Sequence, residues 1–335
     1  MTEILFSTVF RYAPIDQAGE LVKLDWDKKQ VVNKTSVAPK TLQFVDPNPR
    51  GNSRGGRGIA VVDDKVIVAG YCELQVYDLS LNPLYNITNN FMSGLHEVFH
   101  ESGQRLWVTS TTLNAALLID IQTGELLDQV WVQEIPEFQE RWYLTPRNLN
   151  KNEDNRIRFI NKNLERDSSH LHFNAVSVWK GDLFGLFNRY GAVVNLRRNK
   201  VILEDRHIFG AHNLIILDDG TIFINDTRNQ GVNIYNMDGV LKKRINLLPF
   251  HRARNQVRQY KLTTPFRKLG GKIGFSQPEI VMPFFVRGMD IKEDLLFIGI
   301  SPAAILCLNW QTGKLVDVFN YSDDTKIAVH GLKLV

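Results

Sequence analysis

Cysteine is scarce in this 335-residue chain, which has only Cys72 and Cys307. Two cysteines cannot build a disulfide framework, and both lie in apolar runs typical of strands, so we expect two buried thiols. No run of 18 apolar residues occurs, which argues against a membrane-spanning helix. The first residues, MTEILFSTVFRY, include an acid at position 3 and alternate like a strand, unlike a secretory or transit peptide. We therefore expect a soluble, cytoplasmic protein with no membrane partner.

A large excess of charge of one sign is also missing. The net charge is +4, too small to favour nucleic acid as a partner of the whole surface. Positive charge is instead concentrated in residues 251–272, which contain seven Lys or Arg residues and no acidic residue. This segment predicts either a solvated loop or a contact with an acidic partner protein. Nucleotide-binding loops, zinc-finger spacings and the nucleophile elbow of hydrolases are absent as well.

Two stretches far apart in the chain are nearly the same. LLIDIQTGELLD (117–128) and LCLNWQTGKLVD (306–317) each read as a strand, a tight turn and a second strand. In such hairpins an Asp or Asn caps the turn through its side chain, and Gly accepts a positive φ. The pattern occurs six times, at residues 21–32, 74–85, 117–128, 192–203, 232–243 and 306–317.

A second pattern of strand, polar turn and strand precedes five of these hairpins. In all five copies the first residue precedes the middle of the second apolar run by ten positions. The copies are residues 57–70, 96–110, 173–187, 212–226 and 287–301. The sixth hairpin has only EILFSTV (3–9) before it, and the missing strand appears at the far end as HGLKLV (330–335).

This arrangement predicts an all-β fold, a six-bladed β-propeller whose ring is closed by the C-terminal strand joining the N-terminal blade. Self-similar units of four short strands, without helical periodicity, favour this fold over a sandwich or an open solenoid. We expect one domain, residues 1–335, with insertions at 134–171 and 248–286. Long loops of this kind are usually either functional or disordered.

The residues that begin the innermost strands predict a ligand site, because these positions crowd together at one mouth of a propeller channel. Five of the six residues in the first column are Arg or His. This column is Arg57, His96, Phe173, His212, Arg287 and His330. The second column is Gly58, Glu97, Asn174, Asn213, Gly288 and Gly331, whose glycines suggest close approach of the backbones. Neighbouring residues of a regular strand face opposite sides, so the sequence leaves open which column faces the axis.

Four interpretations of this mouth remain open. His96, His172, His212 and His330 could hold zinc or iron. Glu97, Asn174 and Asn213 offer oxygen ligands for calcium. Without a metal, Arg57 and Arg287 could clamp an anion while His96, His212 or His330 performs acid/base catalysis. Finally, the polar groups could simply line a water-filled channel.

Several blade phrases resemble a known superfamily. FNAVSVWKGDLFGLF (173–187), GAHNLIILDDGTIFIND (210–226) and VRGMDIKEDLLFIGIS (286–301) are similar to blades of the NHL and gluconolactonase-like propellers. HLHFNAV (170–176) and AHNLII (211–216) further resemble a bacterial six-bladed family of unknown function.

The superfamily resemblance implies an axial calcium held by Glu97, Asn174 and Asn213. The third of these ligands is Asp in the lactonase-type enzymes, so losing this acid weakens a site for a hard cation.

Two functions follow as hypotheses. One is an enzyme acting on a small molecule at the axial mouth, either a lactonase-like hydrolase or an enzyme that rearranges a small metabolite, with or without a divalent metal. The alternative is a non-catalytic propeller that binds a ligand or a partner protein through its inserted loops. The fold transfers from such a resemblance more readily than the activity.

Overall fold

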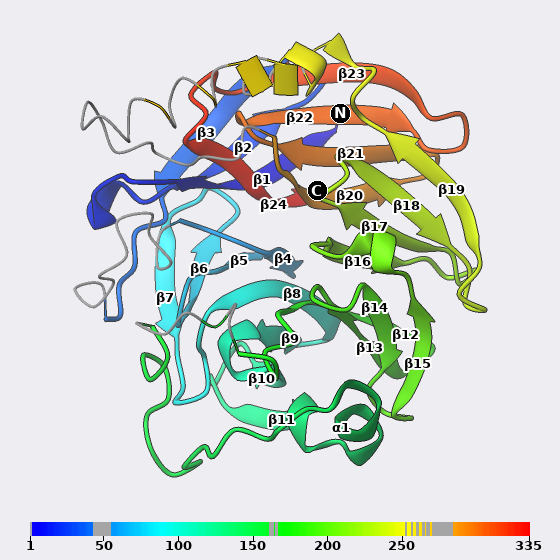
Figure 1. The fold of residues 1–335 in the computed structure, drawn as a ribbon. Helices are drawn as coiled ribbons and strands as arrows, with labels where there is room; N and C mark the ends of the chain where they lie inside the picture. Colours follow the sequence, from blue (N-terminus) through cyan, green and yellow to red (C-terminus); the bar gives the residue numbers. More distant parts are fainter. Residues whose placement is uncertain are drawn as a thin grey trace.

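The computed structural model describes residues 2–42, 55–160, 164, 167–251, 253–255, 257–258, 261–262, 265, 269 and 284–335. Within these residues the chain forms six four-stranded antiparallel sheets arranged in a ring (Figure 1). The inner strand of each sheet lies against the inner strands of its two neighbours. The predicted six-bladed β-propeller is therefore confirmed.

The blades follow one another along the chain, and only the first is built from both ends. Blade 1 contains β24 (Ile327–Leu334), β1 (Glu3–Phe10), β2 (Glu20–Asp25) and β3 (Gln30–Ser36), from inside to outside. Blade 2 contains β4 (Ile59–Val62), β5 (Lys65–Ala69), β6 (Leu74–Asp78) and β7 (Pro83–Ile87). Blade 3 contains β8 (Leu95–Ser102), β9 (Arg105–Ser110), β10 (Ala115–Asp120) and β11 (Leu126–Trp131).

The second half of the ring has the same order. Blade 4 contains β12 (Phe173–Trp179), β13 (Asp182–Phe187), β14 (Ala192–Asn195) and β15 (Lys200–Glu204). Blade 5 contains β16 (His212–Ile216), β17 (Ile222–Asp226), β18 (Gly231–Tyr235) and β19 (Leu241–Asn246). Blade 6 contains β20 (Val286–Lys292), β21 (Leu295–Ile300), β22 (Ala304–Asn309) and β23 (Lys314–Asn320).

Burial explains why the middle strands are continuous apolar runs. Every residue of β17 and β18 is buried, because both faces of a blade pack against neighbouring blades. The outermost strands are largely exposed; no residue of β3 and only Ile87 of β7 is buried, and β3 ends in four consecutive polar residues, Asn33 to Ser36. Such exposed, polar edges discourage pairing with another chain. Cys72 and Cys307 are buried and free, as predicted.

The ring closes where β24 pairs with β1. Ile4 lies opposite Leu334 and Ser7 opposite Gly331, so the last strand completes the first blade. The Ser7 hydroxyl accepts a hydrogen bond from the Gly331 N–H at 2.9 Å and donates to the Arg57 carbonyl at 2.6 Å. One side chain therefore connects the closing strand to blade 2.

The two predicted insertions leave the ring between β11 and β12 and between β19 and β20. The first contains the helix α1 (Pro136–Trp142), which the sequence patterns did not indicate. Of the second, residues 248–251, 253–255, 257–258, 261–262, 265, 269 and 284–286 are described, and helix begins at His251. Short 3-10 turns lie at η1 (Ile15–Gln17), η3 (Thr111–Leu113), η4 (Val132–Glu134) and η6 (Arg206–Ile208). Among the described residues, no helix is long and apolar enough to span a membrane.

Candidate functional site at the axial mouth

The inner strands are irregular where the predicted site lies. In blade 3 the pairing of β8 with β9 skips from Leu95 to Val98, so that His96 and Glu97 together face the single residue Thr109 in a bulge. Similar interruptions fall at Asn174, at Asn213 and at Arg287 with Gly288. A bulge re-aims side chains and breaks strict alternation. Residues of both predicted columns therefore reach the axial region.

Glycine in the second column permits the close backbone approach that the sequence suggested. A Cβ atom on Gly58 would lie 2.8 Å from the Cα of Glu97, and one on Gly331 would lie 2.0 Å from the carbonyl oxygen of Arg57. Gly288 has a φ of +69° and Asn213 a φ of +56°. Both conformations lie in the left-handed region, which Gly adopts freely and Asn more readily than most residues.

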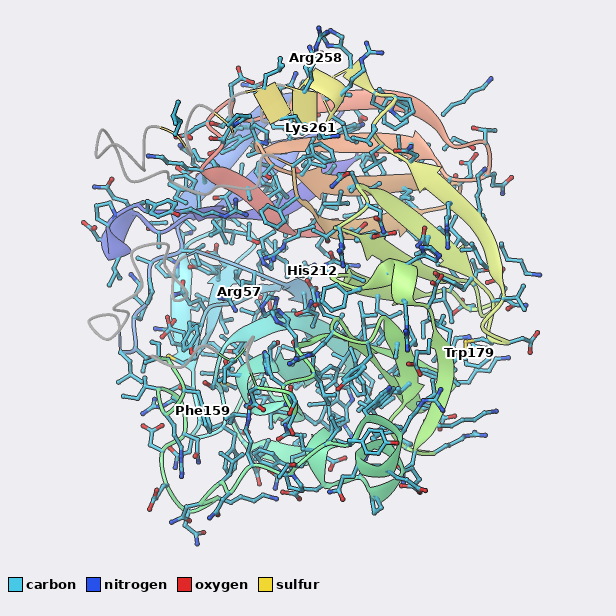
Figure 2. The ribbon with its side chains drawn as sticks, in the orientation of Figure 1. Arg57, Phe159, Trp179, His212, Arg258 and Lys261 are labelled. Carbon is cyan, nitrogen blue, oxygen red and sulfur yellow. The ribbon has the colours of Figure 1, made fainter. Side chains whose placement is uncertain are left out.

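Four imidazoles converge on the axis, with His96 in the middle. Its ring centroid lies 5.6 Å from that of His172, 6.0 Å from that of His212 and 5.5 Å from that of His330. His170 extends this cluster, since its ring lies 5.2 Å from that of His172. Figure 2 shows His212 near the centre of the ring of blades. The structure thus brings together the histidines that the sequence singled out.

Two predicted arginines border the imidazoles. Arg287 donates from Nη1 to Nε2 of His330 at 2.5 Å, and its guanidinium lies over the Phe285 ring. Arg57 donates from Nη1 to the Leu95 carbonyl at 2.5 Å and lies near the centre of the ring in Figure 2. Both arginines are partly exposed, whereas His212 and His330 are buried. The two guanidinium groups are therefore accessible to a ligand that enters the mouth.

Glu97 and the asparagines form a polar layer beside the imidazoles. Glu97 Oε1 accepts a hydrogen bond from Asn213 Nδ2 at 2.6 Å. Asn213 Oδ1 accepts from the Gly288 N–H at 3.0 Å and from Asn225 Nδ2 at 2.9 Å. A backbone N–H can only donate, so it fixes this amide with its nitrogen towards Glu97. That orientation does not suit a cation shared by Glu97 and Asn213.

Unpaired acceptors remain in the same layer. Asn174 Oδ1 and Asn225 Oδ1 are buried without a hydrogen-bond partner, while Asn174 Nδ2 donates to the Ala211 carbonyl at 2.9 Å. Among the described residues, no group of three or more His, Cys, Asp or Glu side chains is arranged to hold a metal ion. Asn174 is thus the one member of the predicted oxygen-ligand set, Glu97, Asn174 and Asn213, whose amide oxygen has no partner.

Burial and positive charge favour the neutral form of His96, His212 and His330. Desolvation, followed by the charge of Arg57, holds the pKa of His96 well below its usual range. Desolvation and Arg287 do the same for His212 and His330, although a backbone interaction with Gly210 favours protonation of His212. Burial also raises the pKa of Glu97 to about 8, against the opposing effects of Arg287 and Asn213. The site at neutral pH therefore combines cationic guanidiniums with neutral rings and a largely protonated acid.

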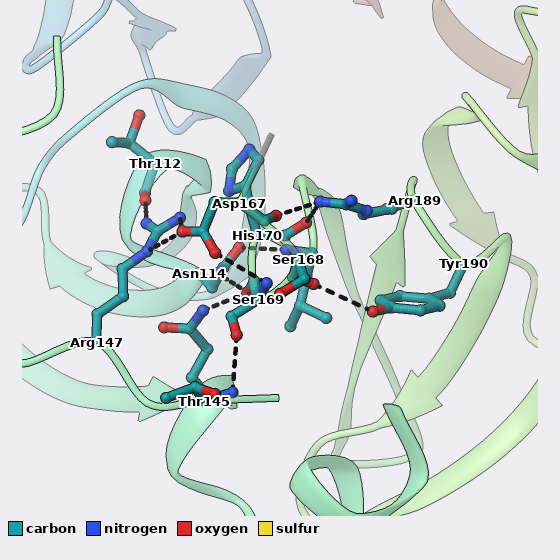
Figure 3. A network of polar contacts seen from close by, with 12 residues as sticks. Thr112, Asn114, Thr145, Arg147, Asp167, Ser168, Ser169, His170, Arg189 and Tyr190 are labelled. Atoms are coloured by element: carbon teal, nitrogen blue, oxygen red, sulfur yellow. Dashed lines mark hydrogen bonds and ion pairs between the residues drawn. The ribbon is translucent and has the colours of Figure 1, made fainter. Parts of the chain in front are cut away.

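The first insertion holds the His170 to His172 segment in place (Figure 3). Arg147 contacts Asp167 at 2.8 Å through Nη2 and donates to the Thr112 carbonyl. Arg189 donates to the Asp167 carbonyl, and Asn114 Oδ1 accepts from the Leu171 N–H at 3.1 Å. This network connects the insertion to blades 3 and 4. It places His172, whose φ is +53°, beside His96.

Blade 4 departs from the predicted column. Phe173 is fully buried and packs on Phe187, with 5.4 Å between the ring centroids, so it does not reach the mouth. His172 takes that place. Thr227 was not among the predicted site residues, yet its hydroxyl lies 3.0 Å from Nδ1 of His212. The available signal was a Thr two residues after Asn225, the residue paired with His212. In blade 3, Thr111 similarly donates to a carbonyl of the next blade, that of Phe173, at 2.6 Å.

Comparison with known proteins identifies the fold only. No protein-family model matches the chain, and no curated protein matches it. Among solved structures, the chain is similar to a protein of unknown function from Bacteroides caccae, with a TM-score of 0.60 and 11% identity over 100% of this chain and 98% of the other. It is also similar to a chain of a nidogen/laminin complex, with a TM-score of 0.56 and 9% identity over 100% and 98%. At these identities the likeness carries the propeller architecture and no activity.

Proposed function

We propose that this protein binds a small anionic molecule at its axial mouth and that the neutral imidazoles there provide acid/base groups. The observation that carries this proposal is the convergence of Arg57 and Arg287 on the cluster of histidines around His96. A guanidinium donates to oxyanions in a fixed fork, and its attraction is strong where water is partly excluded. Resemblance to the NHL and gluconolactonase-like superfamily supports a small-molecule ligand.

The imidazoles suit catalysis as well as binding. A neutral ring can accept a proton at its lone-pair nitrogen and can donate a hydrogen bond from its N–H, and the tautomer decides which of the two meets the anion. A largely protonated Glu97 adds a second acid close to the same axis. Hydrolysis or rearrangement of an anionic metabolite is the reaction class we propose for this set.

The arginines are tested by isothermal titration calorimetry with acetate, lactate, phosphate and sulfate. We expect at least one anion to bind to the wild type and its affinity to fall about 30-fold or more in the double variant Arg57→Met/Arg287→Met, because each charged hydrogen bond contributes about 1.5–3 kcal/mol. The matched control is Arg197→Met/Arg198→Met, which removes two arginines paired with Asp128 and Asp182 on the outside of blade 4. Equal loss in both double variants, or no binding by the wild type, would refute the anion site.

A bound cation is the second candidate for this site, and the buried, unpartnered Oδ1 atoms of Asn174 and Asn225 favour it. Calcium suits such oxygens, whereas zinc or iron would require the imidazoles. Elemental analysis of tag-free protein, repeated on His96→Ala/His212→Ala and on Asn174→Ala, separates these ions. A stoichiometric metal that is lost in only one of these variants would identify its ligands. The proposal of a metal-free anion site would then give way to that of a metal site.

A non-catalytic propeller that contacts an acidic protein is the alternative. Arg254, Arg258 and Lys261 are exposed, and the last two lie at the rim of the molecule in Figure 2, away from the axis. One similar structure is itself a chain of a protein complex. The rest of the basic segment 251–272 lies outside the described residues. We further propose a cytoplasmic location, supported by two unpaired, buried thiols.

A further inference from the structure

The hydrogen bonds of Thr227 define the tautomer of His212. The Thr227 hydroxyl donates its single proton to the Val286 carbonyl, at 2.7 Å. The same oxygen lies 3.0 Å from Nδ1 of His212, so here it must accept. Nδ1 therefore carries the ring proton, and Nε2 of this neutral imidazole presents a lone pair.

Among the residues that the structure describes, this lone pair has no partner. Nε2 of His212 is buried without a hydrogen bond, and the residue as a whole is 7% exposed. The rings of His96 and His172 lie beside it, at 6.0 Å and 6.3 Å between centroids. A buried acceptor without a donor is unfavourable, which is why nearly all such atoms in folded proteins are paired. A ligand that brings a donor would satisfy it.

The opposite polarity occurs at His330. A guanidinium has donors only, so Nε2 of His330 accepts from Arg287 and the ring proton lies on Nδ1. That Nδ1 is also buried without a partner. Among the described residues, His212 therefore presents an unpaired acceptor and His330 an unpaired donor, next to the two guanidiniums.

We infer that the axial site selects small oxyanions that carry a hydroxyl group, with the charged oxygens accepting from Arg57 and Arg287 and the hydroxyl donating to Nε2 of His212. This inference rests on the anion site proposed above and adds its selectivity. Hydrogen phosphate and hydroxycarboxylates share the required chemistry. Sulfate and simple carboxylates would fill the same space and leave Nε2 unpaired.

Two matched pairs of anions test the inference by calorimetry at pH 7: phosphate against sulfate, and lactate against propionate. We expect a preference of about tenfold or more for the hydroxyl-bearing member of at least one pair, since a site left with an unpaired polar group discriminates strongly. The pair that shows the preference identifies the source of the hydroxyl. Equal affinities within both pairs would overturn the inference while leaving anion binding intact. If the wild type bound none of the four anions, the anion site itself would be refuted.

The variant His212→Asn isolates Nε2. Its amide nitrogen can occupy the position of Nδ1 and still donate to Thr227, while the Nε2 acceptor is deleted. We expect the preference for the hydroxyl-bearing anion to fall to within about twofold. His207→Asn, on an exposed residue of η6, is the matched control and should keep the preference. A preference that persists in His212→Asn would overturn the assignment of the acceptor.

A measurement on the wild type keeps the inference testable if His212→Asn does not fold. The ring nitrogens of His212 have distinct ¹⁵N chemical shifts in each tautomer, so long-range ¹H–¹⁵N correlation spectra report which one is protonated. We expect a protonated Nδ1 in the free protein. A proton on Nε2 would overturn the inference irrespective of any variant.

Discussion

The outer hairpins and the inner strand ends of the same six blades repeat to different degrees. In the hairpin of blade 3, Asp120 Oδ1 accepts from the N–H groups of Gln122 and Thr123 at 2.9 Å. In blade 6, Asn309 Oδ1 accepts from the Thr312 N–H at 2.8 Å. Gly124 and Gly313 follow with φ values of +76° and +78°. Each outer hairpin needs the same two features, a side chain that caps the turn and a glycine with positive φ, so its sequence repeats.

The inner ends share a backbone device and differ in their side chains. Bulges recur there, yet the residues they present are Glu97 in one blade, Asn174 and Asn213 in the next two, and Gly288 in the sixth. All of these positions meet around one axis, where each side chain must complement the others. Variation at equivalent positions of one chain therefore marks the site, and repetition marks the scaffold.

The largest effect is expected at the closing glycine. Gly331→Ala would place a Cβ 2.0 Å from the Arg57 carbonyl oxygen, so backbones must separate and the free energy of unfolding should fall by about 3 kcal/mol or more. Gly313→Ala in an outer hairpin meets only the end of Lys243 at 3.7 Å, and its cost of about 1 kcal/mol comes from the positive φ. Urea unfolding measures both. Similar losses would contradict the contrast between inner and outer positions.

The second effect concerns the hydroxyl that connects the closing strand to blade 2. Ser7→Ala leaves the Gly331 N–H and the Arg57 carbonyl without this partner, so we expect a loss of about 2 kcal/mol in the free energy of unfolding. Ser80→Ala, on an exposed outer turn, should change it by less than about 0.5 kcal/mol. If urea unfolding gave equal changes for the two variants, the hydrogen bonds of the Ser7 hydroxyl would contribute nothing to stability.

The third effect depends on pH. The pKa of Glu97 is raised to about 8 in the folded protein from 4.5, because burial disfavours its charged form. Between these values the folded state retains a proton that the unfolded state has released, so raising the pH should lower stability. Glu97→Gln removes this dependence, and its stability relative to the wild type should rise by about 1 kcal/mol or more from pH 5 to pH 8. Urea or thermal unfolding between pH 5 and pH 8 measures this. If the difference in the free energy of unfolding between Glu97→Gln and the wild type stayed constant, Glu97 would be ionised in the folded protein throughout this range.

The smallest effect compares two outer hairpins with each other. Asp120→Ala and Asn309→Ala each remove side-chain acceptors that cap a turn, at an expected cost of about 0.5–1 kcal/mol. The two costs should agree within about 0.5 kcal/mol, because the hairpins are structurally equivalent. A clear difference by urea unfolding would mean that an outer hairpin also has a role of its own.

Much of the fold could be predicted because its determinants are local. Alternation, turn residues and repeat spacing place each strand, and the incomplete first unit predicts the closing strand, although β24 begins at Ile327 rather than at His330. The helix α1 was not predicted, since a seven-residue segment has too few turns to show a helical period. The site was predicted in part. His96, His212 and His330 do converge, whereas Phe173 turns into the core.

By itself, the sequence determined the number of blades, the closure of the ring and the collection of Arg and His at the starts of inner strands. These features depend on residues close together in the chain and on their repetition. The tertiary structure alone decided which side chains meet, because bulges at Asn174 and Asn213 redirect them and the first insertion brings His172 to the place that Phe173 leaves. It also decided the tautomer of His212, since Thr227 and the Val286 carbonyl come together only when blades 5 and 6 pack.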